Sequence, residues 1–215
     1  MTLTLAHAGP ADVPRITQLE TEIFSPWPIY VGLFPNGASL SRRLVVEARY
    51  HHLLANDPST HLLKVSDEST GTIIAAALWN VYTHDRTEEE LVRDSQFDWS
   101  PDTSSLDACL KYSRQLLDCR KRVIGGKPHC LLRWLETEAE YRKRGAATQL
   151  VTWGSKKADE LGIPCYLEAS DEGKPVYEKH GYVEVGEFSL DIGGEDGKKM
   201  SGGKVMVRQT VAKEQ

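Results

Sequence analysis

Long apolar runs are missing from this 215-residue sequence. No stretch approaches the roughly 20 apolar residues that span a bilayer. The opening residues, Met1 to His7, contain no basic segment followed by an apolar run, which is the mark of a signal peptide. We therefore expect no membrane-spanning helix and no contact with a membrane, and the expected location is cytoplasmic.

Cysteine is scarce and irregularly placed. Cys109, Cys119, Cys130 and Cys165 form no CxxC pair, and no histidine lies near them at the spacing of zinc ligands. This pattern predicts four reduced thiols in a cytosolic protein and no metal site.

A surplus of basic residues is lacking as well. Lysine and arginine number 26 against 31 aspartates and glutamates, which gives a net charge of -5. A protein that neutralises phosphates is usually basic on at least one face, so nucleic acid is disfavoured as the main partner. The remaining composition is typical of a globular protein, and the length suffices for one sizeable α/β domain.

Apolar spacing predicts strands and helices along the whole chain. The segment 24–30, rich in proline and aromatic residues, is expected to be a loop. Residues 84–126 are interpreted as a helical insertion rather than a separate domain, because no flexible linker bounds them on both sides. The second and third strands are joined by a polar turn and should pair antiparallel. Strands are expected at about 2–8, 61–65, 72–79, 129–137, 165–168, 182–190 and 203–210, and helices at about 11–23, 39–56, 106–117, 146–161 and 173–180.

The most informative segment is YRKRGAA, residues 141–147, between an expected strand and an expected helix. The first N–H groups of a helix have no partner inside it, and the helix dipole is positive there. A pyrophosphate fits such an end when small residues let the backbone come close. Arg142, Lys143 and Arg144 add positive charge, while the motifs GxxxxGK[ST] and GxGxxG with a following acidic residue are absent.

This junction resembles the acetyl-CoA loop of the GNAT superfamily of acetyltransferases, written Q/R-x-x-G-x-G/A. Three further features follow the family's order: an apolar strand at 131–137, a second strand at 166–170 and the segment YEKHGY at 177–182, which is similar to Y-x-x-x-G-F/Y. The strong match covers about residues 128–190.

The resemblance implies one N-acetyltransferase domain over residues 1–215, of the α/β (α+β) class. Its sheet would be mixed, mostly antiparallel and twisted, with helices on both faces and the helical insertion between the third and fourth strands. Acetyl-CoA would bind in a single cleft between the strands at 129–137 and 165–169.

The resemblance also implies an activity. Acetyl-CoA, the cosubstrate, would give its acetyl group to the amine of a small molecule or peptide by direct transfer in a ternary complex. No metal is implied, no cysteine is placed for a covalent acyl intermediate, and a monomer or homodimer is expected. Two alternatives stay open: a non-catalytic acyl-CoA-binding or sensing module of this fold, and an adaptor that binds through the basic residues Arg120, Lys121, Arg122 and Lys127.

Particular residues take roles from the resemblance. The backbone of Leu135, Glu136 and Thr137 would pair with the pantetheine arm, and Tyr177 would protonate the departing CoA thiolate. A phenol with a pKa of about 10 is mostly protonated at neutral pH, which suits that role. Ser170 falls where other members contact CoA, and it equally fits a cap of the next helix. The pyrophosphate would bind amides of Arg142, Lys143, Arg144, Gly145, Ala146, Ala147 and Thr148.

The base that deprotonates the incoming ammonium has no clear motif. Many family members carry a glutamate at a place that falls here near Leu131, so the sequence departs from the pattern. Glu168 is the first candidate and His129 the second, the latter for its useful pKa. Glu168 alternatively caps the next helix, and a water chain or an amine that arrives neutral would need neither residue.

Three glutamates, Glu136, Glu138 and Glu140, put negative charge beside the expected anion site. We expect their side chains to point away into solvent.

Aromatic residues mark the acceptor side that the family builds from the loop after its first helix and from the insertion. These rings form a box for an aryl or cationic amine, or they anchor the loop to the core. Acidic residues of the insertion would attract a cationic amine, or they form a solvated helix face. The rings are Phe24, Trp27, Tyr30, Phe34, Phe97 and Trp99, and the acids are Asp85, Glu88, Glu89 and Glu90.

Overall fold

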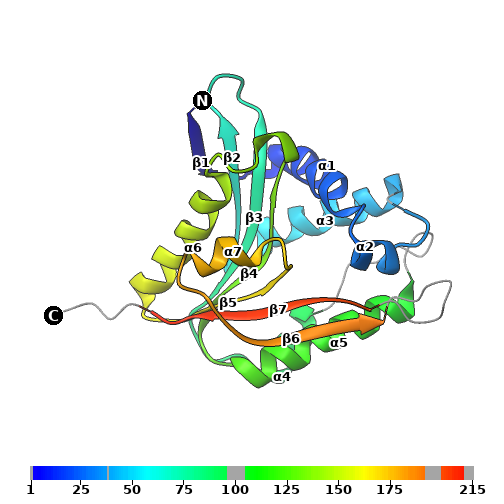
Figure 1. Ribbon diagram of the computed structural model, residues 1–215, viewed down its shortest axis with the longest axis vertical. Helices are drawn as coiled ribbons and strands as arrows, with labels where there is room; N and C mark the ends of the chain where they lie inside the picture. Colours follow the sequence, from blue (N-terminus) through cyan, green and yellow to red (C-terminus); the bar gives the residue numbers. More distant parts are fainter. Residues whose placement is uncertain (1, 38, 96–104, 192–199, 211–215) are drawn as a thin grey trace.

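A computed structural model describes residues 2–37, 39–95, 105–191 and 200–210. Its centre is a seven-stranded sheet in the order β1-β2-β3-β4-β5-β7-β6 (Figure 1). Neighbouring strands pair antiparallel, except that β4 and β5 are parallel, so the expected mixed, mostly antiparallel sheet is confirmed. The strands are β1 (Leu3–His7), β2 (Thr60–Asp67), β3 (Ile73–Tyr82), β4 (His129–Thr137), β5 (Cys165–Ala169), β6 (Val183–Asp191) and β7 (Met200–Arg208).

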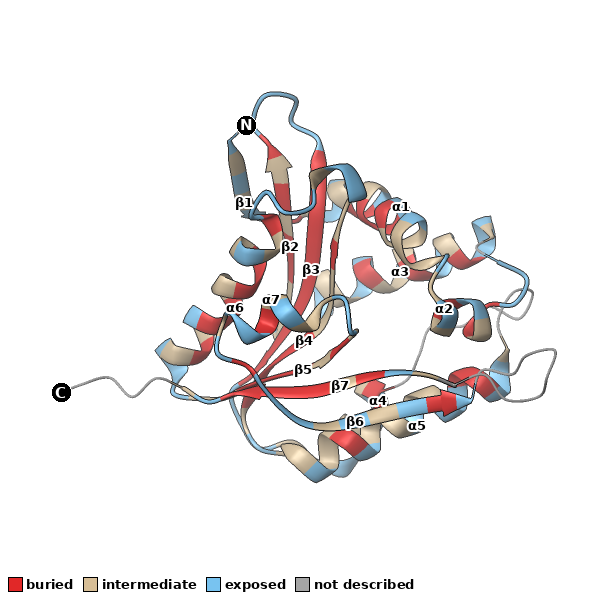
Figure 2. Ribbon diagram, viewed as in Figure 1, coloured by how far each residue is buried: buried red, intermediate tan, exposed pale blue. Residues whose placement is uncertain are grey.

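Helices cover both faces of this sheet, as expected. Helix α6 packs on one face, and α1, α3 and α5 pack on the other. Every residue of β3 is buried because both of its faces are covered, and Figure 2 shows this strand buried along its length. The helices are α1 (Val13–Phe24), α2 (Pro28–Leu33), α3 (Leu40–Asn56), α4 (Glu88–Ser95), α5 (Leu106–Val123), α6 (Ala146–Leu161) and α7 (Lys174–Glu178), with 3-10 turns at Pro10–Asp12 and Ala139–Tyr141.

The expectation of a loop at 24–30 is wrong in part. Helix α1 ends at Phe24, and α2 begins at Pro28 only a few residues later. Proline is well tolerated at the first helical position, where its fixed φ suits the helix and its missing N–H costs no hydrogen bond. The proline that we interpreted as excluding a helix therefore begins one.

The segment between β3 and β4 contains α4 and α5, and α5 runs through the basic residues 120–122. Phe97 and Trp99 lie outside the described residues. The four cysteines are buried and form no disulfide, and Cys130 faces Cys165 across the β4–β5 pair.

The parallel pair β4–β5 is short, and this opens the sheet. Only Cys130, Leu131 and Leu132 pair with β5. Beyond Leu132, β4 pairs with β3 alone, and the end of β5 pairs with β7 alone. On β3, Leu78 pairs with Trp134 while Trp79 pairs with Leu132, so Arg133 is an extra residue in β4. Such a bulge bends a strand and increases its twist, and here it lies where β4 and β5 part.

Helix α6 approaches the sheet most closely at Gly154. A Cβ atom there would overlap the ring of Trp79, which is fully buried and donates a hydrogen bond from Nε1 to the carbonyl oxygen of Leu150 at 3.2 Å. We expect Gly154→Ala to lower the free energy of unfolding by about 1–3 kcal/mol, because an extra methyl in a packed core forces side chains off their rotamers. Urea denaturation measures this change. The control is Gly9→Ala, whose Cβ would meet nothing within 4 Å, and equal losses in both variants would contradict the argument.

Candidate active site

A cleft of about 1000 Å³ opens where β4 and β5 part. The end of β4, the first turn of α6 and α7 line one half of it, while α1, α2 and residues of α5 and β4 line the other. The structure thus gathers residues from both ends of the chain. Among the expected CoA-binding residues, Arg144 alone does not line the cleft, and its guanidinium carbon lies 5.3 Å from the ring centroid of Tyr141. The candidates that line it are Leu135, Glu136, Thr137, Arg142, Lys143, Gly145, Ala146, Ala147, Thr148, Glu168, Ser170 and Tyr177.

The first turn of α6 is left without a side-chain cap among the described residues. Gly145 is the residue before the helix, with a left-handed φ of 92°. Lys143 is also left-handed, with φ of 61°, which costs a residue other than glycine about 1–2 kcal/mol. Backbone strain of this kind collects at ligand sites. The N–H groups of Ala146, Ala147 and Thr148 have no partner inside the helix, so this end can receive a phosphate.

Tyr177 lies on α7 and reaches the cleft with only 8% of its surface exposed. Burial raises its pKa, so the phenol stays protonated well above neutral pH. Gly173 packs closely beside it, since a Cβ there would lie 3.2 Å from Cε2 of Tyr177 and the ring would have to shift slightly. The hydroxyl of Ser170 lines the same part of the cleft and accepts a hydrogen bond from the N–H of Gly173 at 3.1 Å, so Ser170 also closes the turn into α7.

Glu168 lines the cleft at the end of β5, but its carboxylate is already engaged. Nε and Nη2 of Arg120 donate to its two oxygens at 2.8 and 3.0 Å. Both side chains are buried, at 6% exposure for Glu168 and 11% for Arg120. Because both oxygens already accept hydrogen bonds from Arg120, neither faces the cleft as a free acceptor for an ammonium proton, so this geometry argues against Glu168 as the base.

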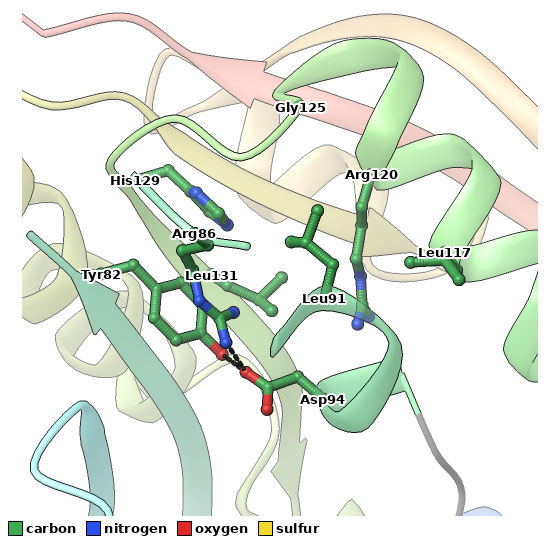
Figure 3. A pocket seen from close by; sticks show the side chains of 9 residues that line it. All are labelled: Tyr82, Arg86, Leu91, Asp94, Leu117, Arg120, Gly125, His129 and Leu131. Atoms are coloured by element: carbon green, nitrogen blue, oxygen red, sulfur yellow. Dashed lines mark hydrogen bonds and ion pairs between the residues drawn. The ribbon is translucent and has the colours of Figure 1, made fainter. Parts of the chain in front are cut away.

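His129 lies outside the cleft, in a separate cavity of about 10 Å³ beneath α4 and α5 (Figure 3). Its Nδ1 is 2.7 Å from the carbonyl oxygen of Lys127, and burial lowers its pKa to about 4. Figure 3 shows Asp94 beside it, bound by Tyr82 and Arg86. A cavity of this size holds about one water molecule, so His129 does not reach an acceptor in the cleft.

The structure corrects the expectation for Glu136, whose side chain does not point into solvent. It is 2% exposed and lines the cleft, and neither carboxylate oxygen has a hydrogen-bond partner among the described residues. Its pKa is raised well above the usual value by burial and then by Glu20 of α1, and Arg15 opposes this shift. Glu20 also lines the cleft and accepts a hydrogen bond from the hydroxyl of Tyr50 at 2.6 Å. The two carboxyl groups form an acidic pair that we did not foresee.

The bulge at Arg133 explains why the sequence did not reveal this pair. Simple alternation would place Glu136 on the face of Leu132, which packs under α6. The extra residue moves Trp134 and Glu136 to the opposite face, where Trp134 packs with Tyr50 of α3. A bulge leaves little signal in a single sequence, although three glutamates spaced by two along 136–140 mark the segment as unusual.

The charged residues of the insertion pair with one another rather than facing the cleft. Lys127 binds Asp85 at 3.1 Å and Lys121 binds Glu88, while Glu90 accepts a hydrogen bond from the N–H of Thr87. The acids therefore do not mark an acceptor site. The same pairs, together with the buried Arg120, neutralise most of the basic patch on which an adaptor would depend.

Three of the expected acceptor-side rings, Phe24, Trp27 and Tyr30, line the cleft. Phe34 does not: it is 1% exposed, and the guanidinium carbon of Arg42 lies 3.6 Å from its ring centroid, so it anchors the segment to the core.

Metal-binding clusters and membrane-spanning helices are both absent from the residues that the structure describes. These residues contain no cluster of three or more metal-binding side chains. None of their helices combines the length and apolarity needed to cross a membrane.

Solved structures resemble this fold along the whole chain. Arylalkylamine N-acetyltransferase 2 from Aedes aegypti is 14% identical, with 97% of this chain and 99% of that chain covered and a TM-score of 0.69. A phosphinothricin acetyltransferase from Sinorhizobium meliloti, solved in complex with AcCoA, is 15% identical, with 98% and 89% covered and a TM-score of 0.59. The structure described as histone acetyltransferase HPA2 and related acetyltransferase from Corynebacterium glutamicum is 18% identical, with 99% of both chains covered and a TM-score of 0.62.

At these identities the likeness to solved structures shows the fold alone. No curated protein matches the sequence. The model of the acetyltransferase (GNAT) family matches residues 22–182, which is more than half of the chain. The protein therefore belongs to the GNAT acetyltransferase family.

Proposed function

We propose that this protein transfers the acetyl group of acetyl-CoA to an amine by direct attack within one cleft. The observation that carries this proposal is the opening between β4 and β5, which has a helix end without a described side-chain cap in one half and the carboxyl groups of Glu20 and the buried Glu136 in the other. Tyr177 lines the same opening. An anion site, a proton donor and a proton acceptor along one path are what the proposed transfer requires, and this arrangement supports it.

The CoA half of the cleft fits an extended thioester with a pyrophosphate. No strand among the described residues pairs with Leu135 or Glu136 on the side of β5, because that ladder stops at Leu132. An amide-containing arm such as pantetheine can add to such an edge as another strand would. The N–H groups at the start of α6 would then receive the pyrophosphate, with Arg142 and Lys143 nearby.

The reaction balances with three proton movements, because the nitrogen loses two protons in becoming an amide and the second of them replaces the proton that Tyr177 gives up. A bond forms between the amine nitrogen and the acetyl carbon, the bond from that carbon to sulfur breaks, and the acetyl group enters as the thioester of CoA. Glu136 takes the proton that the ammonium must lose, since its raised pKa makes it a stronger base than an ordinary glutamate. Tyr177 gives a proton to the sulfur that leaves.

Calorimetric titration with acetyl-CoA and with CoA tests the proposal first, followed by a free-thiol assay over a panel of amines. Binding with turnover supports an acetyltransferase. Binding without turnover of any amine would favour the sensing module instead, and no binding would remove both.

Tyr177→Phe is expected to lower kcat by about 10²-fold, because the variant cannot protonate the leaving sulfur. Its affinity for acetyl-CoA should stay the same, because the ring and its packing remain. Steady-state kinetics and calorimetry separate the two effects. Tyr182→Phe is the matched control, since Tyr182 is equally buried and does not line the cleft. If kcat of Tyr177→Phe stayed within about threefold of wild type, the acid would have to be another group.

A further inference from the structure

The acceptor half of the cleft is lined by Arg42, which lies over the ring of Phe34, and by Arg133, which pairs with Asp94, and otherwise mostly by rings and aliphatic side chains. The rings come from helices α1, α2 and α5, from the turn after α1 and from strand β4, so parts that are distant in the sequence contribute to one apolar surface. A surface of this kind binds apolar groups such as rings rather than extended polar chains, because a polar group placed on it loses its hydrogen bonds to water. The principal members are Phe24, Trp27, Ile29, Tyr30, Tyr112 and Trp134.

These rings are held in place before any ligand arrives. Phe24 and Trp27 meet edge to face with their centroids 5.0 Å apart, and the N–H of Trp27 donates to the carbonyl oxygen of Phe24 at 2.9 Å. Tyr30 packs on Phe34 at 4.6 Å. Aromatic pairs favour such tilted contacts, and a flat ring added beside them gains the same interaction.

The acidic pair lies in this apolar half. Glu20 precedes Phe24 by four residues on α1, so its carboxylate and that ring lie on neighbouring parts of one helix face. Glu136 is buried, and both of its oxygens are without partners in the described part of the chain. Glu168 does not compete for a cation, because Arg120 binds both of its oxygens. An ammonium group entering here meets two carboxyl groups at one point and apolar rings beyond them.

We infer that the acceptor is a primary monoamine carried on an aromatic ring, an arylalkylamine that lacks an α-carboxylate. This inference rests on the proposed acetyl transfer. The α-carboxylate of an amino acid would lie beside its amine and therefore against Glu20 and Glu136, where like charges repel. A polyamine would place its second positive charge further into this half, where Arg42 and Arg133 also line the cleft and repel a cation.

The first experiment compares acceptors matched by ring. Tryptamine and phenethylamine are assayed by free-thiol release against tryptophan and phenylalanine, with spermidine and a lysine-containing peptide as further arms. We expect kcat/KM for each amine to exceed that for its amino acid by about 100-fold, because only the amino acid brings a like charge to the acidic pair. A binding readout independent of turnover is calorimetry of tryptamine, and of tryptophan, added to protein saturated with CoA.

Substitutions of the aromatic residues test whether the amine binds in the acceptor half of the cleft. Trp27→Ala should raise KM for tryptamine about tenfold and leave KM for acetyl-CoA unchanged, because the lost ring faces only the acceptor. Phe24→Leu keeps an apolar side chain and removes a ring, so it tests the same wall with little risk to folding. Leu44→Ala is the control, since Leu44 is apolar but 53% exposed on α3 and lies outside the cleft.

The outcomes separate the two proposals. Acetyl-CoA binding with faster turnover of spermidine, the peptide or the amino acids would overturn the arylalkylamine inference and keep the acetyltransferase. Acetyl-CoA binding with no turnover of either arylalkylamine would also overturn it. No binding of acetyl-CoA would overturn the proposed function itself.

Discussion

Glu136→Gln is expected to lower kcat/KM for the amine by about 10²–10⁴-fold at neutral pH, the range that general-base catalysis contributes. Glutamine has nearly the same shape and breaks no hydrogen bond with the described residues, because neither oxygen of Glu136 has a partner among them. What it removes is the ability to take up a proton beside the acceptor. Initial rates of thiol release at saturating acetyl-CoA measure the change.

The pH profile gives this prediction a second readout. The base must be ionised to act, so kcat/KM of the wild type should rise with pH as Glu136 loses its proton. Burial and the neighbouring Glu20 raise the pKa of this carboxyl, so the rise should lie above the range of an ordinary glutamate. In Glu136→Gln this limb of the profile should disappear.

The melting temperature of Glu136→Gln shows whether the variant has lost only catalysis or has also lost its fold. Between the ordinary pKa of glutamate and the raised pKa of Glu136, the folded protein holds a proton that the unfolded chain has lost. The stability of the wild type therefore falls as pH rises through that interval. Glu136→Gln lacks this term, so its melting temperature relative to wild type should increase with pH.

The matched control is Glu138→Gln, two residues further along the chain. Its side chain is 30% exposed and pairs with Arg15 at 3.1 Å, so its loss should leave the rate and the pH limb in place. Activity of Glu136→Gln within about threefold of wild type would assign the base to another group.

Gly145→Glu is expected to weaken acetyl-CoA binding by about two orders of magnitude or more. A carboxylate beside the first turn of α6 would face the pyrophosphate, and two like charges about 4 Å apart repel by about 4 kcal/mol at the effective dielectric of a protein surface. A Cβ on Gly145 would meet nothing within 4 Å, so the substitution does not disturb the packing. Calorimetry with acetyl-CoA and with CoA gives the two affinities.

Backbone strain is the competing explanation, and the other end of the same helix controls for it. Gly162 follows α6 with a left-handed φ of 69°, against 92° for Gly145, and its Cβ would also meet nothing within 4 Å. Gly162→Glu should therefore lose similar stability, about 1–2 kcal/mol, while binding acetyl-CoA as the wild type does. Equal affinities in the two variants would show that the start of α6 is not the pyrophosphate site.

Local signals were enough to place much of this fold. The expected bounds of β4 and α6 agree with the structure, because an apolar run, a helical repeat and a glycine at each end of the helix are all short-range features. The prediction failed at 24–30, where Pro28 begins a helix, because a proline is compatible with a helix when its missing N–H falls at the helix start.

The helix start at Ala146 could be predicted from local sequence, since the free N–H groups of a first turn and the left-handed Gly145 are properties of a few consecutive residues. Only the tertiary structure decided which carboxylate is suited to take up a proton. Arg120 engages Glu168 from 48 residues away, and the bulge at Arg133 turns Glu136 toward Glu20 of α1. The basicity of a carboxyl group depends on its burial and on the charges around it, and folding sets both by bringing distant segments together.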